Sequence, residues 1–489
     1  AFVRPAAAPV IAVGNRLITL TPQPVKSTAI DSAGTDDKPL LLIGIYVLLA
    51  VFGAMIGSAA LVGLRRGLIG VAVLTAFGSY CALTANASRV SDVVPTLGGG
   101  VVSAGALVLL VRFARFGETA QGTGSPGRPH ADRRVFLQGA GAAVVVAAAT
   151  GFVGREIQHA RFDVADARAK IVLPPARADG VAQTVPLGAD LGKSPVPWRT
   201  PNGNFYRIDT ALTVPQISPK DWRLRIHGMV DRPITISYDD LLKRPLVDRW
   251  ITLCCVSNPV GGELVSNSLW RGALLADLLR EAGLRAESDQ LVLTSEDGMT
   301  LGAPTAVVMD GRAALLAVGM NGQPLPLEHG FPARVVVPGL YGYVSACKWV
   351  VDIEATTYAA NQPYWVQGGW AAKTPVKMLS RIDRPTSSGA VTVGQTTTIA
   401  GVAWDQHVGI SKVEVRVNDD PWRSARLARV PSSDTWRQWV LPWTPPKSGQ
   451  YRLTVRATDA AGNLQDTKSR DVFPSGATGL HTVTVRAVG

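Results

Sequence analysis

The feature that most restricts the fold is a series of long apolar runs in the first third of the chain. A helix crosses a lipid bilayer with about 20 apolar residues, and four runs are of roughly that length, at residues 40–64, 68–85, 93–111 and 135–154. The third contains Gly98-Gly99-Gly100, but glycine is frequent in membrane helices, where it allows close packing. We therefore expect four transmembrane helices within residues 39–155, preceded by an irregular, Pro-rich segment at 1–38.

The arginines around these runs predict their orientation. Arg65 and Arg66 lie between the first two runs, whereas the short loop between the second and third has only Arg89. The loop before the fourth run contains Arg112, Arg115, Arg128, Arg133 and Arg134. The positive-inside bias places the arginine-rich loops in the cytoplasm, so residues 1–38 and everything after about 155 lie outside.

Residues 132–137 (DRRVFL) are similar to a twin-arginine export signal. The alternative is a basic flank on an ordinary membrane helix. Both interpretations place the rest of the chain on the extracytoplasmic side. We therefore expect a multi-pass protein of the cell membrane whose large C-terminal part lies outside the cytoplasm.

The composition narrows the function classes. The chain carries 49 Lys and Arg against 37 Asp and Glu, a net charge of +12. Part of this excess flanks the apolar runs, and no aromatic-basic recognition motif accompanies it, so we expect no nucleic-acid binding. The four cysteines, Cys81, Cys254, Cys255 and Cys347, form no C-x-x-C pair and no C-x-x-C-H haem motif. Outside the cytoplasm Cys254 and Cys347 could pair, but we favour buried free thiols.

The pattern after the apolar runs predicts a linker and two folded domains. Residues 156–200 are charged and then rich in Pro, Ala and Gly, which is typical of a linker. Residues 201–380 mix short strands and helices, one of them ending at Gly283, and predict an α+β domain. Residues 381–489 contain alternating strands at short spacing and predict an immunoglobulin-like β-sandwich, a fold that most often serves as an interaction or spacer module.

One strand-like run ends at Cys254 and Cys255, before a Ser257-Asn258-Pro259 turn signal. Paired cysteines are often buried packing, but the end of a strand is also a common place for a functional ligand. TLCCVSN at 252–258 and WRGALLAD at 270–277 resemble the sulfite oxidase family of molybdopterin enzymes. Further stretches extend the resemblance in the expected order, at 204–210, 222–228, 321–334, 337–342, 436–439 and 456–465.

The resemblance implies a molybdenum–molybdopterin cofactor and residues that bind it. Cys255 matches the cysteine that ligates molybdenum, for which a soft thiolate is a suitable ligand. Arg334 and Lys348 match positions that hold the pterin, whose phosphate calls for cations. His329, beside the same Gly-Phe-Pro turn, is a weaker candidate. Asp209 occupies a place where many relatives have a pterin-contacting histidine.

The resemblance also implies residues on the substrate side. Arg207 matches an arginine that faces the substrate oxyanion, Arg437 is placed as a second one from the sandwich, and Tyr364 lies loosely where the family has a tyrosine. The sandwich itself resembles the family's dimerisation domain, so a homodimer is expected. The family usually has two arginines directly after the Asn that follows the metal cysteine, whereas this chain has Asn258-Pro-Val-Gly-Gly262. That loss of charge favours a less charged or bulkier substrate than sulfite.

Taken together, these features predict a membrane-anchored molybdopterin oxidoreductase that performs oxygen-atom transfer on a small sulfur-oxo substrate. Because the chain lacks a haem motif, we expect a separate electron acceptor, such as a cytochrome, a membrane redox protein or a quinone. One alternative is a reductase of S-oxides or N-oxides, for example of methionine sulfoxide, on the same fold. A non-enzyme alternative is a membrane receptor or adhesion protein that displays the immunoglobulin-like domain.

Overall fold

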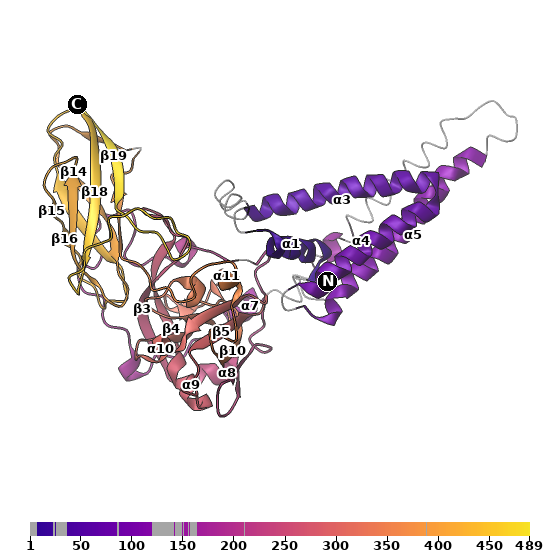
Figure 1. Cartoon of the computed structure of the whole chain (residues 1–489), viewed down its shortest axis with the longest axis horizontal. Helices are drawn as coiled ribbons and strands as arrows, with labels where there is room; N and C mark the ends of the chain where they lie inside the picture. Colours follow the sequence, from indigo (N-terminus) through magenta and orange to yellow (C-terminus); the bar gives the residue numbers. More distant parts are fainter. Residues whose placement is uncertain are drawn as a thin grey trace. The chain divides into compact units, whose positions relative to one another are not determined.

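The computed structural model divides into two compact units (Figure 1). The first comprises Ala1–Val164 with Thr210–Gln216, and the second comprises Ala165–Asp209 with Ile217–Gly489. The residues that the structure describes are 7–22, 25, 37–85, 88–119, 141, 149, 151–154, 156, 164–209, 211–387 and 389–489.

Among its described residues, the first unit contains three helices long and apolar enough to cross a membrane, at Lys38–Val62, Leu64–Thr84 and Val90–Arg112. They belong to α3 (Asp37–Val62), α4 (Leu64–Thr84), and the short 3-10 turn Val90–Val93 with α5 (Val94–Thr119). Glycine permits close packing between them: a Cβ at Gly67 of α4 would collide with Ala60 of α3, and one at Gly100 of α5 with Thr75 of α4. Three expected spans are therefore confirmed as helices of spanning length.

The N-terminal segment differs from the expectation of irregular structure. Pro9–Leu20 form helix α1, with Pro9 at the first helical position, where its missing N–H needs no partner. At 12 residues, α1 is too short to span a bilayer alone. Most of the fourth predicted span, 135–154, and both arginines of the export motif, Arg133 and Arg134, lie outside the described residues.

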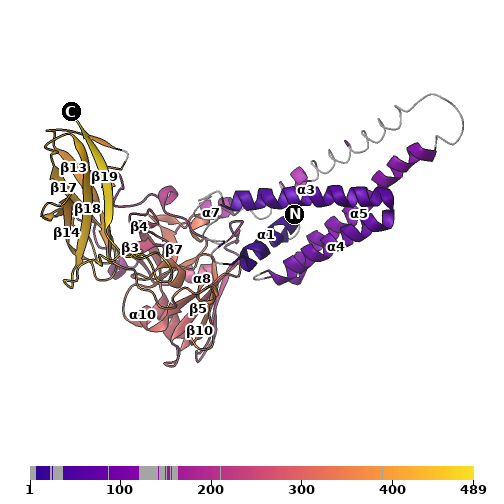
Figure 2. The same ribbon diagram turned by 45° about the horizontal axis from the view of Figure 1, so that its top comes forward.

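The α+β domain is built on two sheets (Figure 2). The first has the order β2-β1-β10-β5-β6 and the second β3-β4-β7-β8, with β9 also paired to β7. The first sheet contains β1 (Arg223–Gly228), β2 (Ile234–Ser237), β5 (Gln290–Ser295), β6 (Thr300–Pro304) and β10 (Val350–Thr356). The second contains β3 (Leu246–Cys254), β4 (Val265–Leu274), β7 (Leu315–Met320), β8 (Gln323–Pro324) and β9 (Arg334–Val336).

Short helices connect these strands. They are α7 (Ala165–Ala169), α8 (Tyr238–Leu242), α9 (Leu275–Ala282), α10 (Thr305–Met309) and α11 (Tyr364–Gln367). Helix α9 ends at Gly283 with φ 71°, the left-handed conformation of a C-cap, as the sequence predicts. Part of the expected linker instead packs onto the domain: α7 belongs to the second unit, and Trp198 is buried.

The C-terminal residues form the predicted β-sandwich of two sheets, ordered β11-β13-β17-β16 and β12-β19-β18-β14-β15. Its strands are β11 (Leu379–Arg384), β12 (Ala390–Thr392), β13 (Thr397–Trp404), β14 (Ile410–Val417), β15 (Arg423–Ser424), β16 (Arg426–Leu427), β17 (Arg437–Trp443), β18 (Gly449–Asp459) and β19 (His481–Val488). Inward-facing residues of both sheets, among them Ile399, Val413 and Trp439, form its core.

The sandwich and the α+β domain share a second hydrophobic cluster. Trp198, Cys254 and Tyr341 of the α+β domain pack together with Trp404 and Trp436 of the sandwich. The Trp436 indole N–H also donates to the Trp198 carbonyl at 2.8 Å. The two domains are therefore joined through a common core that reaches the end of β3.

Candidate cofactor site

Cys255 lies directly after β3, where the chain leaves the sheet. The strand pairs with β4 as far as Cys254, opposite Val265, and the Cys255 N–H then donates to the Leu264 carbonyl at 2.9 Å. Cys254 is fully buried in the shared cluster, whereas Cys255 is 9% exposed. All four cysteines are free thiols, as favoured from the sequence. The two adjacent thiols thus have separate environments, one inside the core and one at its margin.

Ser257 supplies hydrogen bonds to the Cys255 sulfur. Burial raises the pKa of Cys255, while donors from the Ser257 backbone and side chain oppose that increase. The thiol is therefore protonated in the absence of metal. A metal ion would displace the proton, and the Ser257 donors would then stabilise the resulting thiolate.

Arg334 is a buried cation on β9 and is 5% exposed. Its Nη1 donates to the His329 carbonyl at 3.1 Å and its Nη2 to the Ala346 carbonyl at 3.4 Å, and the guanidinium lies 5.0 Å from the Trp270 ring centre. Within the described part of the chain, its Nε is buried without a hydrogen-bond partner and no carboxylate forms an ion pair with it. Burial lowers the pKa of Arg334 to about 10, so it stays charged at neutral pH. A buried cation of this kind favours a bound anion.

Lys348 is a second buried cation, but it has a carboxylate partner. Its Nζ lies 2.9 Å from Asp209 Oδ2, and the same oxygen lies 2.9 Å from Arg207 Nε. The Asp209 and Lys348 side chains are 4% and 11% exposed, whereas that of Arg207 is 44% exposed. Burial lowers the pKa of Lys348 to about 8, and Asp209 opposes that shift. Asp209 thus bridges a buried cation and a solvent-facing one.

Gly330 brings the predicted cofactor residues together. It has φ 107°, and a Cβ there would lie 3.0 Å from Arg334 Cβ and 3.1 Å from Lys348 Cα. His329 precedes it, is buried, and has Nε2 3.0 Å from the Asn202 carbonyl. Burial and the charge of Arg334 lower the pKa of His329 to about 4, so the imidazole is neutral. The turn therefore places two cations and a neutral histidine side by side.

Tyr206 lies near both Cys255 and Arg334, and it was not predicted from the sequence as a site residue. Burial raises its pKa, and the proximity of Cys255 and Cys254 raises it further, while Arg334 opposes the shift. Its backbone N–H donates to Ser266 Oγ at 3.2 Å. The phenol is therefore close enough to both the metal-ligand candidate and the buried arginine for their charges to act on it. The available signal in the sequence was its place directly before Arg207, in a stretch already singled out.

The structure does not group Arg437 or Tyr364 with these residues. Arg437 lies on β17, and its Nε and Nη1 each donate at 2.6 Å to a sandwich carbonyl, those of Ala428 and Ile410. Tyr364 begins α11, and its N–H donates to Thr300 Oγ1 at 3.1 Å. The Arg437 bonds hold its guanidinium within the sandwich, whereas the Tyr364 bond is made by its backbone. They lend no support to a role for either one beside Cys255.

The residues present fit a molybdenum–molybdopterin cofactor. Among the described residues, no group of three or more His, Cys, Asp or Glu side chains could hold a metal ion alone. A metal at Cys255 would therefore need ligands from a cofactor. The unpartnered Nε of Arg334 and the ammonium of Lys348 suit the phosphate that a pterin carries.

Comparisons with known proteins agree with this chemistry. Residues 211–365 match the oxidoreductase molybdopterin binding domain, and residues 380–455 match the bacterial Ig domain. Mitochondrial sulfite oxidase of Mus musculus is 30% identical over 317 residues, which are 54% of this chain and 57% of that enzyme. The chain thus spans little more than half the length of this relative.

Two other proteins are similar to the chain. The uncharacterized oxidoreductase YuiH of Bacillus subtilis is 34% identical over 150 residues, which cover 30% of this chain and 72% of that protein. The sulfane dehydrogenase SoxCD from Paracoccus pantotrophus shares the fold, with a TM-score of 0.52 and 24% identity over 65% of this chain and 91% of that one. This chain belongs to the sulfite oxidase family of molybdopterin-dependent oxidoreductases.

Proposed function

We propose that the chain is a membrane-anchored, extracytoplasmic enzyme that transfers an oxygen atom to or from a small sulfur-oxo compound. The observation that carries this proposal is the buried Arg334, which has no carboxylate partner among the described residues and whose Nε has no hydrogen-bond partner there. When bound, the cofactor supplies two-electron oxygen-atom chemistry at molybdenum. The protein supplies one thiolate, two buried cations and a water-restricted setting.

Each residue has a distinct role in this proposal. Cys255 gives up its proton to ligate the metal, with the Ser257 donors holding the sulfur. Arg334 and Lys348 bind the pterin phosphate. Arg207, whose side chain is 44% exposed, is the cation available to an anionic substrate.

The substrate is proposed to carry less charge than the site's cations alone would suggest. Asp209 already pairs with Arg207 and Lys348. The turn after Cys255 has no cationic side chain: it runs Asn258-Pro-Val-Gly-Gly262, with Asn258 Oδ1 accepting the Leu264 N–H at 2.8 Å. These observations keep a reductase of neutral S-oxides or N-oxides as a second candidate beside oxidation of sulfite.

The membrane side and the electron partner belong to the same proposal. The three apolar helices support the anchor, and Arg65 and Arg66 at the start of α4 favour a cytoplasmic position for that end of the helix. Three spans in this orientation return the chain to the cytoplasm, so the proposed outside position of the catalytic unit depends on the predicted fourth span at 135–154. Electrons would pass to or from a separate carrier, such as a cytochrome, a membrane redox protein or a quinone. The sandwich is proposed to mediate homodimer formation.

The test uses the full chain, purified in detergent from a host that makes the cofactor. We expect stoichiometric molybdenum in the wild-type protein and its loss in Cys255→Ser. Well-folded wild-type protein without molybdenum would overturn the proposal and favour the receptor or adhesion alternative. Sulfite-dependent reduction of an acceptor dye, compared with S-oxide-dependent oxidation of a reduced dye, then distinguishes the two directions.

A further inference from the structure

Strand β3, which leads to Cys255, lies at the end of its sheet in the order β3-β4-β7-β8. An edge strand has backbone groups that no strand of its own sheet satisfies. At Thr252 the sandwich satisfies them: the Thr252 N–H donates to the Asp434 carbonyl at 2.9 Å, and Gln406 Nε2 donates to the Thr252 carbonyl at 3.5 Å. The sandwich thus completes the edge of the strand that carries the metal-ligand candidate.

The Thr252 side chain strengthens this junction. Its hydroxyl oxygen accepts the Trp436 N–H at 2.8 Å and donates to Asn267 Oδ1 at 3.0 Å. Thr252 is 1% exposed, so these bonds are made away from water. One hydroxyl therefore joins β3 both to β4 and to the sandwich.

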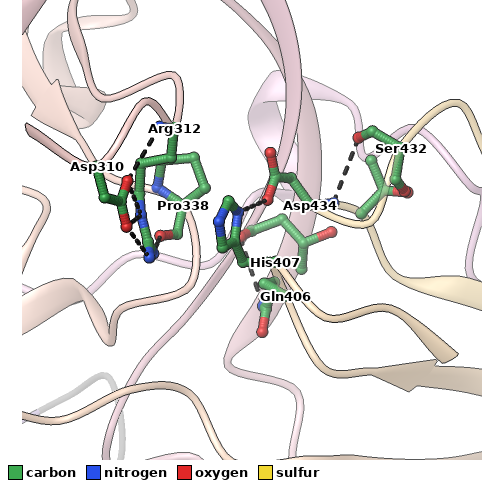
Figure 3. A network of polar contacts seen from close by, with 9 residues as sticks. Asp310, Arg312, Pro338, Gln406, His407, Ser432 and Asp434 are labelled. Carbon is green, nitrogen blue, oxygen red and sulfur yellow. Dashed lines mark hydrogen bonds and ion pairs between the residues drawn. The ribbon is translucent and has the colours of Figure 1, made fainter. Parts of the chain in front are cut away.

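The sandwich loops that reach Thr252 are themselves held in place (Figure 3). His407 Nδ1 lies 3.1 Å from Asp434 Oδ1, and the Asp434 N–H donates to Ser432 Oγ at 3.3 Å. The α+β side of this junction is held as well: Arg312, which like His407 lies against Gly339, binds Asp310 and donates to the Pro338 carbonyl at 2.7 Å. The contacts to β3 thus come from fixed loops.

A second set of sandwich contacts holds the turn after Cys255. Arg381 of β11 donates to the Gly262 carbonyl at 2.6 Å. Gly261 has φ 80°, and a Cβ there would collide with the ring of His481, the first residue of β19. His481 Nδ1 accepts the Ile382 N–H at 3.0 Å, which fixes its ring against the turn. Sandwich residues therefore hold the chain both before and after Cys255.

We propose that the sandwich is a clamp that fixes the position of the Cys255 sulfur, with Thr252, Arg381 and His481 as positioning residues. A metal site requires its ligands to be held within about 0.5 Å by surrounding contacts. The two sets of contacts supply that restraint from a domain whose family match is to an Ig module. The inference rests on the proposed function only in treating Cys255 as the metal ligand.

The first test measures the rate at which iodoacetamide alkylates Cys255 in the cofactor-free full chain, resolved from Cys254 by mass spectrometry. Thr252→Val removes both hydroxyl bonds at nearly constant volume, and Thr252→Ser keeps them. We expect alkylation at least about tenfold faster in Thr252→Val, because losing even one buried hydrogen bond shifts local opening by about that factor and this variant loses two. Thr252→Ser should stay within about twofold of wild type.

The second test addresses the other side of the clamp. Gly261→Ala forces a methyl group toward His481, and we expect faster alkylation of Cys255 again. Gly322→Ala is the matched control, because Gly322 has a similar φ of 81° but nothing within 4 Å of the added Cβ. It carries the same backbone strain and should leave Cys255 unchanged. If Thr252→Val does not fold, the comparison of Gly261→Ala with Gly322→Ala still tests whether the sandwich contacts hold Cys255.

X-ray absorption at the molybdenum edge of the loaded enzyme distinguishes a residue that positions the Cys255 sulfur from one that only stabilises the fold. Thr252→Val should broaden the metal–sulfur distance distribution, and Thr252→Ser should not. Alkylation rates and spectra equal to wild type in both Thr252→Val and Gly261→Ala would overturn the clamp, even in a protein that binds molybdenum. A wild-type chain without molybdenum that still shows the alkylation differences would instead reject the proposed function and keep the clamp.

Discussion

Arg334 and Lys348 both flank Gly330 but differ in how their charge is balanced. Arg334 has its Nε unpartnered among the described residues and donates to carbonyl groups, whereas Lys348 forms an ion pair with Asp209 at 2.9 Å. A buried cation without a counter-charge destabilises the empty protein, and a paired one does so much less. The comparison teaches that the site keeps a net positive charge before the cofactor binds. Of the two cations, Arg334 is the one that the pterin phosphate stabilises more.

Arg334→Met should have the largest effect. It removes the uncompensated cation, so we expect retained pterin to fall by about 100-fold, because charge-assisted hydrogen bonds contribute roughly 1.5–3 kcal/mol each. The melting temperature of the cofactor-free chain should stay unchanged or rise. Pterin fluorescence after denaturation and a thermal scan measure the two quantities. Full pterin content in this variant would contradict the difference between the two cations.

Compared with Arg334→Met, Lys348→Met should lower the stability of the fold more and the retained pterin less. The Asp209 side chain, which is 4% exposed, would then keep only Arg207 of the two cations that pair with it. We expect the cofactor-free chain to lose roughly 1–3 kcal/mol of unfolding free energy and retained pterin to fall by about tenfold. Thermal unfolding of Lys348→Met/Asp209→Asn is the control, and recovery of stability in this double variant is required for the interpretation to stand.

The pH dependence should separate the two cations without mutation. The pKa of Lys348 is about 8 and that of Arg334 about 10, so only Lys348 loses its proton between pH 7 and 9. Phosphate favours the charged lysine, so pterin affinity should fall by up to about tenfold per pH unit above 8. Gel filtration at a series of pH values followed by pterin assay measures this. The decline should be absent in Lys348→Met.

The same pKa predicts the opposite sign for the empty protein. The unfolded lysine titrates near its ordinary value of 10.5, above the folded value of about 8. Between those values the unfolded chain binds more protons, so the Lys348 contribution to stability increases as pH rises from 8 to 10.5. Denaturant unfolding of wild type against Lys348→Met would reveal that increment, and an increment that decreases over this range would rule out a depressed lysine pKa.

Asp209→Asn should have the smallest effect. It removes the carboxylate that pairs with Arg207, so an anionic substrate meets an unneutralised arginine. Lys348 does not add to this effect, because its pKa falls further without Asp209. We expect KM for sulfite to fall by roughly 1.5-fold to fivefold, the range typical of one exposed or half-exposed ion pair, with kcat little changed. Steady-state kinetics with sulfite and with a neutral S-oxide test this. An equal change in KM for the neutral compound would exclude a charge effect.

The sequence predicted those parts of the molecule that depend on local pattern. Apolar length gave three helices of spanning length, and alternation gave the sandwich strands. The segment Pro9–Leu20 was expected to be irregular, because it is short and its apolar residues follow no clear spacing, so pattern alone does not reveal a helix. Trp198 was assigned to a linker because its composition resembles one, although it is buried in the core shared by two domains.

The site was predictable only as far as motifs identify residues one at a time. Cys255, Arg334 and Lys348 follow from the family resemblance, but the meeting of Arg334 and Lys348 around Gly330 depends on long-range packing. Arg437 was placed on the substrate side by its neighbours in sequence, yet its donors bind sandwich carbonyls. Tyr206 escaped notice because nothing in its local sequence distinguishes a site tyrosine from a core one.

Gly330 sets a limit on how this chain can vary over evolutionary time. With φ 107° and Arg334 Cβ and Lys348 Cα about 3 Å from any added side chain, even alanine would separate the two groups that flank it. Gly330 has no side chain with which to bind phosphate or take part in the chemistry. A genetic screen for loss of activity should nevertheless recover substitutions there as often as at the residues that bind the cofactor.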